Sequence, residues 1–139
     1  MHILLADCQP KVRFALRVLL DRQPGLESVG EAVDAEGLLA KIETAHPDLV
    51  LLSWELPGLA EVGSISALRR VCSQQKVIVL SGRVGVRKEA LAAGADAFVS
   101  KTDPPERLLD AISECGQAPK GRAVAEVSRA LSGGVSAMV

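Results

Sequence analysis

Four short apolar runs of this chain each end at a residue that could do chemistry. Residues 49–52 (LVLL) stop at Ser53, and three other runs stop at Asp7, Ser81 and Lys101. In a parallel α/β sheet, ligands and chemistry collect just beyond the carboxyl ends of the strands. A serine hydroxyl in that place can act as a nucleophile, but it needs a base to activate it.

The elements that would position these residues alternate along the chain. Short apolar runs predict five strands, at residues 2–6, 26–31, 49–52, 76–80 and 96–100. Apolar residues at helical spacing predict a helix after each strand. The first is opened by Pro10 and ended by Pro24-Gly25, and the second is capped by Asp34 and closed by His46-Pro47.

The inward faces of the remaining helices are also predicted. The third carries Val62, Ile65 and Leu68, the short fourth Val86, Ala90 and Leu91, and the fifth Leu108, Leu109 and Ile112. Repeated strand–helix units predict an α/β fold, a doubly wound five-stranded parallel sheet with helices on both faces. We expect one domain over residues 1–116, followed by a tail or linker (117–139) with room for one short helix.

Composition narrows the class of protein. The 139 residues are 48% apolar and 2% aromatic, so an aliphatic core can form, and the net charge of −1 predicts no binding to nucleic acid or anionic membrane. No apolar run is long enough to span a bilayer, and no basic stretch precedes the first one, as a signal peptide would require. The three widely spaced cysteines favour neither disulfides nor zinc. We expect a cytoplasmic protein.

Motifs of doubly wound enzymes are missing from the sequence. Asp7-Cys8-Gln9-Pro10 stands where a glycine-rich dinucleotide loop would follow the first strand. Neither a phosphate-binding P-loop nor a nucleophile elbow occurs. The sequence therefore predicts a protein that is not an enzyme.

Five segments in order resemble the receiver domain of two-component response regulators, over residues 2–115. They are ILLAD, LVLLSWELPG, VIVLSG, GADAFVSK and PERLLDAI. The resemblance implies a flavodoxin-like (βα)5 fold and a role in phosphorelay signalling. It is closest to receivers of DNA-binding regulators with a helix-turn-helix output domain, and the printed sequence holds no such domain.

The resemblance also implies roles for particular positions. In the family an acid pair binds Mg²⁺, an aspartate accepts the phosphoryl group, a hydroxyl and a lysine contact that group, and an aromatic residue switches position. In this chain these positions are Asp7 and Cys8 for the acid pair, Ser53 for the acceptor, Ser81 and Lys101 for the contacts, and Phe98 for the switch.

Two of these positions depart from the family pattern. The family's acyl phosphate requires a carboxylate nucleophile, and Ser53 has none. Mg²⁺ prefers oxygen ligands, and Cys8 removes a second carboxylate, so that Asp7 alone would be a weak metal ligand. We therefore predict no cofactor, doubtful Mg²⁺ binding and loss of conventional phosphotransfer.

Glu55 and Arg83 are predicted to refill the pocket. Both positions border the active site in the family. Arg83 could pair with Asp7 or Glu55 and occupy the space of the metal, which would hold the loops in one state.

Several interpretations stay open for single residues. Ser53 either simply ends a strand or is a modified or catalytic serine. Asp7 either caps backbone N–H groups or keeps some metal binding. Cys8 is interpreted as a small buried hydrophobe rather than a redox sensor. Lys101 is expected in the pocket, paired with Asp7 or Glu55, rather than in solvent.

The predicted function is a phosphorylation-independent receiver-like module of two-component signalling. It would act through a protein partner or as a homodimer, by the surface near residues 84–115, without direct contact to nucleic acid or membrane. Two alternatives remain: a working receiver with an unusual acceptor, and the receiver of a DNA-binding regulator whose output domain is missing.

Overall fold

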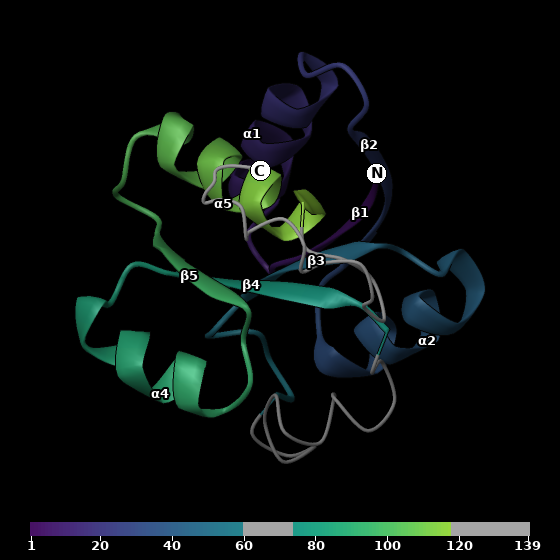
Figure 1. Cartoon of the computed structure of the whole chain (residues 1–139). Helices are drawn as coiled ribbons and strands as arrows, with labels where there is room; N and C mark the ends of the chain where they lie inside the picture. Colours follow the sequence, from purple (N-terminus) through teal and green to yellow (C-terminus); the bar gives the residue numbers. More distant parts are fainter. Residues whose placement is uncertain (60–73, 118–139) are drawn as a thin grey trace.

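A computed structural model describes residues 1–59 and 74–117 (Figure 1). Its strands are β1 (His2–Ala6), β2 (Glu27–Ala32), β3 (Leu49–Ser53), β4 (Lys76–Ser81) and β5 (Ala97–Ser100). Its α-helices are α1 (Pro10–Asp21), α2 (Ala35–Ala45), α4 (Arg87–Ala92) and α5 (Pro105–Gln117), with a short 3₁₀ turn, η1, at Val84–Val86. The predicted third helix and all but the first residue of the predicted tail lie outside the described residues.

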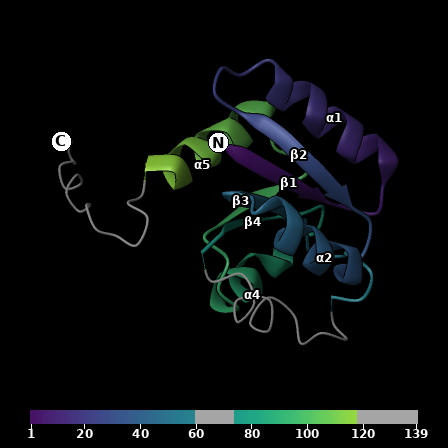
Figure 2. The same ribbon diagram turned by 90° about the vertical axis from the view of Figure 1, so that its right-hand side faces the viewer.

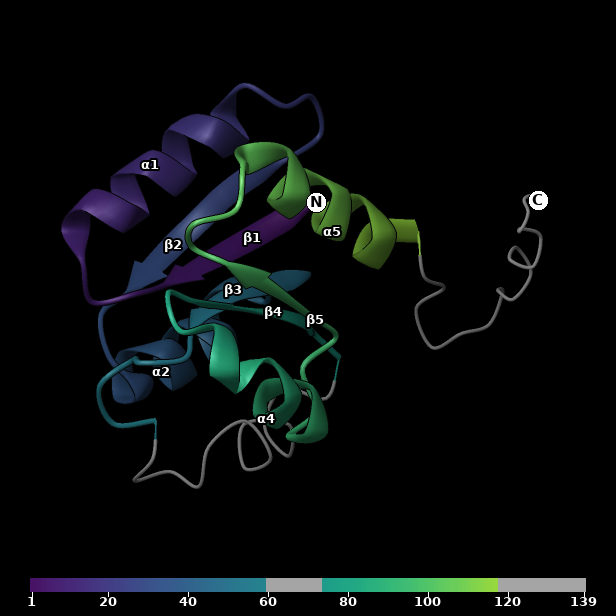
Figure 3. The same cartoon turned by 90° about the vertical axis from the view of Figure 1, so that its left-hand side faces the viewer.

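The five strands form one parallel sheet in the order β2-β1-β3-β4-β5. Figures 2 and 3 show α1 and α5 on one face of this sheet and α2 and α4 on the other. The predicted doubly wound α/β fold is therefore confirmed. Because parallel strands all point the same way, the residues that follow β1, β3, β4 and β5 gather along one edge.

Strand residues alternate between two hydrophobic clusters, one on each face. Leu4, Val50 and Val79 pack on the side of α2 and α4, whereas Leu5 and Leu51 pack on the side of α1 and α5. Each strand of a sheet covered on both faces has to be apolar in both directions. This requirement explains why the runs at β1, β3 and β4 are continuous rather than alternating.

The starts of α1 and α2 agree with the predicted capping chemistry. Pro10 is the first residue of α1, and the Asp34 carboxylate accepts the Gly37 N–H at 2.8 Å at the start of α2. Gly94 lies just beyond α4 with φ +116°, a conformation that glycine adopts at low cost.

Leu91 was predicted to face inward from the fourth helix, and this was wrong. Its side chain is 38% exposed, whereas Val86 and Ala90 are buried as expected. Successive residues of an α-helix point about 100° apart, so the burial of Ala90 turns its neighbour Leu91 toward the border of the buried face. No helix within residues 1–59 and 74–117 is long and apolar enough to cross a membrane.

Candidate functional site

The edge formed by the carboxyl ends of the strands brings together the four chemically capable residues. Asp7 follows β1, Ser53 ends β3, Ser81 ends β4, and Lys101 follows β5. Asp7, Ser53 and Ser81 are buried, with exposed fractions of 2%, 3% and 0%, and the Lys101 N–H donates to the Ser81 carbonyl at 2.9 Å. The site is thus a polar pocket set into the end of an apolar sheet.

Lys101 connects two sides of this pocket. Its ammonium nitrogen lies 2.8 Å from Asp7 Oδ2 and donates to Ser53 Oγ at 3.3 Å. The other Asp7 oxygen, Oδ1, accepts the Gln9 N–H at 2.8 Å. The Asp7 side chain is only 3% exposed, so its charge is compensated inside the protein and not by water. The structure therefore has Lys101 in the pocket, with Asp7 rather than Glu55 as its partner.

Ser81 is engaged by a second carboxylate. Its hydroxyl donates to Glu55 Oε2 at 2.7 Å and accepts the Arg83 N–H at 3.0 Å. The Trp54 N–H donates to the Leu80 carbonyl at 2.9 Å. These bonds join the turn after β3 to the loop after β4.

Arg83 does not fill the space next to Asp7. Its guanidinium lies 3.9 Å from Glu55 Oε2, and its side chain is 69% exposed. Glu55 is one of the two partners that the sequence predicts for Arg83, but an exposed ion pair of this kind contributes little to stability. Instead, the ammonium of Lys101, which follows β5, occupies the place beside the buried carboxylate and reaches Ser53 as well.

The residues present do not fit a magnesium ion. Mg²⁺ requires several hard oxygen ligands in near-octahedral geometry. Asp7 is the one carboxylate inside the pocket among the described residues; its Oδ2 faces an ammonium group, and the nearby Glu55 carboxylate accepts from Ser81. No group of three or more His, Cys, Asp or Glu in the described ranges is placed to hold a metal.

Cys8 is exposed, so its interpretation as a buried small hydrophobe was wrong. The residue follows Asp7 in the turn between β1 and α1, where the chain leaves the sheet and no apolar layer covers it. Cys115, by contrast, lies on the inner face of α5 and is buried.

Thiol labelling is expected to separate these two cysteines. Cys72 lies outside the described residues, so the measurement uses a Cys72→Ser variant. A thiol reagent should label Cys8 rapidly in the folded protein and Cys115 only after denaturation, because reagent access follows exposure. In a further Cys8→Ser variant the rapid phase should disappear. Slow labelling of both thiols would mean that Cys8 is buried after all.

An arginine–glutamate clamp beneath the site was not predicted. Arg13 Nε donates to Glu31 Oε1 at 2.8 Å, and its Nη1 donates to the Asp7 carbonyl at 2.6 Å. Arg17 also pairs with Glu31. The clamp fixes the turn that carries Asp7. The sequence signal was a pair of arginines four residues apart on α1. The acid that they bind, Glu31, lies on β2, and helical periodicity does not predict contacts between separate elements.

Phe98 lies on β5 and is partly buried. Its ring packs against the hydrophobic cluster on the side of α2 and α4. The residue therefore belongs to the surface between α4 and α5, which Figure 3 shows on either side of β5, and it also contacts the core.

Comparison with known proteins gives a consistent family. A family model described as "Response regulator receiver domain" matches residues 3–113. The nitrate/nitrite response regulator NarL of Escherichia coli (strain K12) is 33% identical over 116 residues, which are 81% of this chain and 53% of NarL.

Solved structures agree with this match. A LuxR-family two-component response regulator from Aurantimonas sp. SI85-9A1 superposes with a TM-score of 0.75 at 28% identity, covering 87% of this chain and 86% of that one. The response regulator domain of Thermotoga maritima CheB gives 0.72 at 24% identity, covering 86% and 98%, and shows the fold alone. The chain spans about half the length of the curated relatives it matches.

Proposed function

This chain belongs to the response regulator receiver domain family of two-component signalling, and within that family we propose that it acts as a phosphorylation-independent interaction module. Its output would be contact with another protein and not turnover of a substrate. The name pseudo-receiver fits this proposal.

One observation carries the proposal: the pocket is already neutralised by the chain's own groups. Lys101 pairs with Asp7, and Ser81 donates to Glu55. In the family, the positions of Lys101 and Ser81 contact the incoming phosphoryl group. Here both contact carboxylates, and the serine hydroxyl at the acceptor position accepts from the Lys101 ammonium at 3.3 Å, which is a proton donor and not a base.

A second argument concerns the state of the pocket. The bond from Ser81 to Glu55 joins the ends of β4 and β3, and Lys101 joins the ends of β5, β1 and β3 through Asp7 and Ser53, so that the four strand ends are held in one arrangement. A ligand shifts a protein between two conformations only if it binds one of them more tightly than the other. If the pocket takes no phosphoryl group, no such ligand is available to move Phe98 to a second position. The domain would then be a constant scaffold, or would respond to a signal other than a kinase.

Acetyl phosphate is expected to leave the protein unmodified. The full chain is incubated with this phosphoryl donor, with and without Mg²⁺, and its intact mass and melting temperature are recorded. We expect an unchanged mass and no effect of Mg²⁺ on melting, because the donor set fits the metal poorly. A NarL-type receiver treated in parallel controls for donor activity.

The opposite outcomes have distinct meanings. A phosphoryl adduct mapped to Ser53 would support the alternative of a working receiver with an unusual acceptor. An adduct on Glu55 would mean that the acceptor position has been placed wrongly. Either result would overturn the proposed independence from phosphorylation.

The proposed contact surface includes the region near residues 84–115, that is α4, β5 and α5. β5 is an edge strand of the sheet, and α4 exposes Arg87, Lys88 and Leu91 beside it. The surface has both charge and an exposed apolar side chain, which suits a partner protein or a second copy.

A second candidate is the receiver part of a DNA-binding transcriptional regulator. Relatives of about twice the matched length include LiaR, named "Transcriptional regulatory protein", and SgaR, named "Probable transcriptional regulatory protein". These names fit poorly with the prediction that the protein does not bind nucleic acid. We therefore propose the absence of DNA contact only for the receiver-like domain, residues 1–116. A gene that encodes this domain and a helix-turn-helix domain in one polypeptide would favour this candidate.

A further inference from the structure

The seam between α1 and α5 forms an apolar groove on one side of the sheet. A hollow of about 470 Å³ opens there between the two helices. Its apolar lining includes Val12, Ala15, Leu16, Leu19, Pro105 and Leu108. An apolar recess at a protein surface is typical of a place where another polypeptide segment packs.

A second hollow, of about 280 Å³, continues this seam toward the end of α5. It is lined by Gln23 on the α1 side and by Gly116 on α5. Arg22, the neighbour of Gln23, lines the first hollow, so the two hollows adjoin where α1 ends. Since α5 ends at Gln117, the chain that follows it starts beside the seam.

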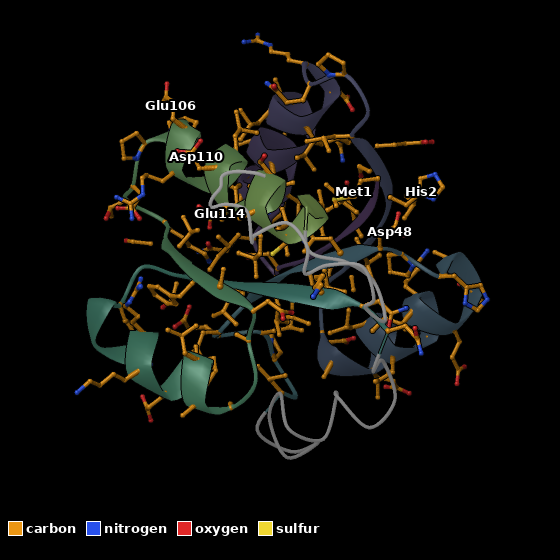
Figure 4. The ribbon with its side chains drawn as sticks, viewed as in Figure 1. Met1, His2, Asp48, Glu106, Asp110 and Glu114 are labelled. Atoms are coloured by element: carbon orange, nitrogen blue, oxygen red, sulfur yellow. The ribbon has the colours of Figure 1, made fainter. Side chains whose placement is uncertain are left out.

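Acidic side chains follow the outer side of α5. Glu106, Asp110 and Glu114 recur at four-residue intervals (Figure 4), and all three are exposed. The segment that follows α5, residues 118–139, carries three basic residues against one acid. Opposite charge therefore favours contact between this segment and α5.

Residues 122–131 of this segment have the pattern of an amphipathic helix. Val124, Val127 and Leu131 fall on one helical face, and the charged residues of the stretch fall on the opposite face. A Ser-Gly-Gly sequence ends the pattern. A helix this short is marginal in water by itself, so it requires an apolar surface against which its apolar face can pack.

We propose that residues 122–131 fold back as a helix into the seam between α1 and α5 and pack their apolar face on the groove. The occupant of the groove is then a segment of the same chain. While it is docked, this face is closed to any other protein, so displacement of the helix would control access to it. The inference goes beyond the proposed function, because it concerns a different face and does not depend on how the pocket treats phosphoryl groups.

The direction and length of the groove suit this segment. α1 and α5 return from parallel strands on the same face, so they run in the same direction, and their starts are level because Lys11 and Pro105 line one hollow. A helix that follows α5 has to run back along the seam, and Pro119 and Gly121 favour a turn before it. Along α1 the groove extends from Lys11 to Arg22, roughly 17 Å at the α-helical rise, and the proposed helix is about 15 Å long.

The charges define a register for the docked helix. When Arg122 lies level with Glu114, Arg129 lies close to the level of Glu106, because the spacing along the two antiparallel helices is nearly equal. In the same register Val127 lies level with Ala15, which lines the groove. Charge attraction to α5 and burial of the apolar face therefore favour the same placement.

Hydrogen–deuterium exchange of the full chain tests whether the helix forms and which face it buries. We expect the amides of residues 122–131 to exchange at least about tenfold more slowly than in a synthetic peptide of residues 118–139. Val127→Asp puts a charge into the groove and should remove this protection, whereas Ala125→Asp, away from the apolar face, should keep it. The two variants are matched in charge. Helix propensity alone would rank them in the opposite order, because alanine is the better helix former.

Disulfide trapping tests where the helix lies. In a Cys8→Ser and Cys72→Ser background, in which the remaining natural thiol is buried, Val127→Cys is combined either with Ala15→Cys in the groove or with Lys88→Cys on α4. Both partner positions are exposed. With oxidised glutathione, the pair with position 15 should close an intramolecular disulfide at least about tenfold faster than the pair with position 88, because docking raises the effective concentration. Intact mass under non-reducing conditions separates this product from disulfide-linked dimers.

Each result decides the proposal. Slow exchange that Val127→Asp abolishes and Ala125→Asp keeps, together with fast closure at position 15, supports it. Exchange as fast as in the peptide, equal closure at positions 15 and 88, or disulfide-linked dimers that increase with concentration, as expected if a second copy fills the groove, would overturn it. None of these measurements involves acetyl phosphate or Mg²⁺, so this inference and the proposed function would fail separately.

Discussion

Replacing Lys101 with methionine is expected to lower the free energy of unfolding by about 3 kcal/mol, because it leaves a buried carboxylate without its counter-ion. The Asp7 side chain is 3% exposed, and its Oδ2 lies 2.8 Å from the Lys101 ammonium. Loss of one member of a buried pair typically costs about 3–5 kcal/mol, and the lower end applies here because Lys101 is itself partly exposed. Urea unfolding followed by circular dichroism measures the loss.

Companion variants isolate the ion pair from other effects of the substitution. Lys88→Met changes an exposed lysine on α4 and should stay within about 0.5 kcal/mol of the wild type. Asp7→Asn, alone and combined with Lys101→Met, completes a double-mutant cycle, in which the double variant should be more stable than the sum of the single losses predicts. If Lys101→Met unfolds at the same urea concentration as the wild type, the pair does not contribute to stability.

The strands were predicted closely because their sequence signal is local. β1 and β3 lie in a sheet that is covered on both faces, which requires continuous aliphatic runs. Turn residues also mark element ends: Pro24-Gly25 follows α1, and Pro57-Gly58 follows β3. The end of a predicted strand also fixes the place of the residue that follows it, at the carboxyl end of the sheet. The meeting of Asp7, Ser53 and Lys101 at one edge therefore followed from the parallel sheet alone.

The details of the site were harder to predict because they depend on side-chain reach. Lys101 and Arg83 both follow strands at this edge, and both carry a positive charge on a long side chain. Only the backbone path decides which one enters: Lys101 comes from β5 and reaches Asp7, while Arg83 sits in the loop after β4 and extends into solvent. Cys8 was misjudged for a similar reason, since residue type predicts average burial and not the exposure of one turn.

Restoring two carboxylates is expected to create a Mg²⁺ site at the end of the sheet, where the described residues place one buried carboxylate, Asp7. The variant combines Cys8→Asp with Ser53→Asp, so that three carboxylates converge on the edge beside Lys101. Without metal this variant should be less stable than the wild type, because a new carboxylate at the buried position 53 is brought near the buried Asp7 carboxylate. Mg²⁺ supplies the opposite charge and prefers oxygen ligands, so its addition should raise the melting temperature of the variant only.

The same variant is expected to accept a phosphoryl group from acetyl phosphate in the presence of Mg²⁺. A carboxylate oxygen at position 53 would attack phosphorus and acetate would leave, so the intact mass should rise by one phosphoryl group. The Cys8→Asn and Ser53→Asn variant matches the new side chains in shape without their charge, and it should show neither the metal effect nor the adduct. A double-aspartate variant that binds Mg²⁺ but gains no adduct would assign the remaining block to Glu55, whose carboxylate accepts from the Ser81 hydroxyl at 2.7 Å. Failure to bind Mg²⁺ at all would instead mean that the Lys101–Asp7 pair, and not the missing carboxylates, keeps the metal out.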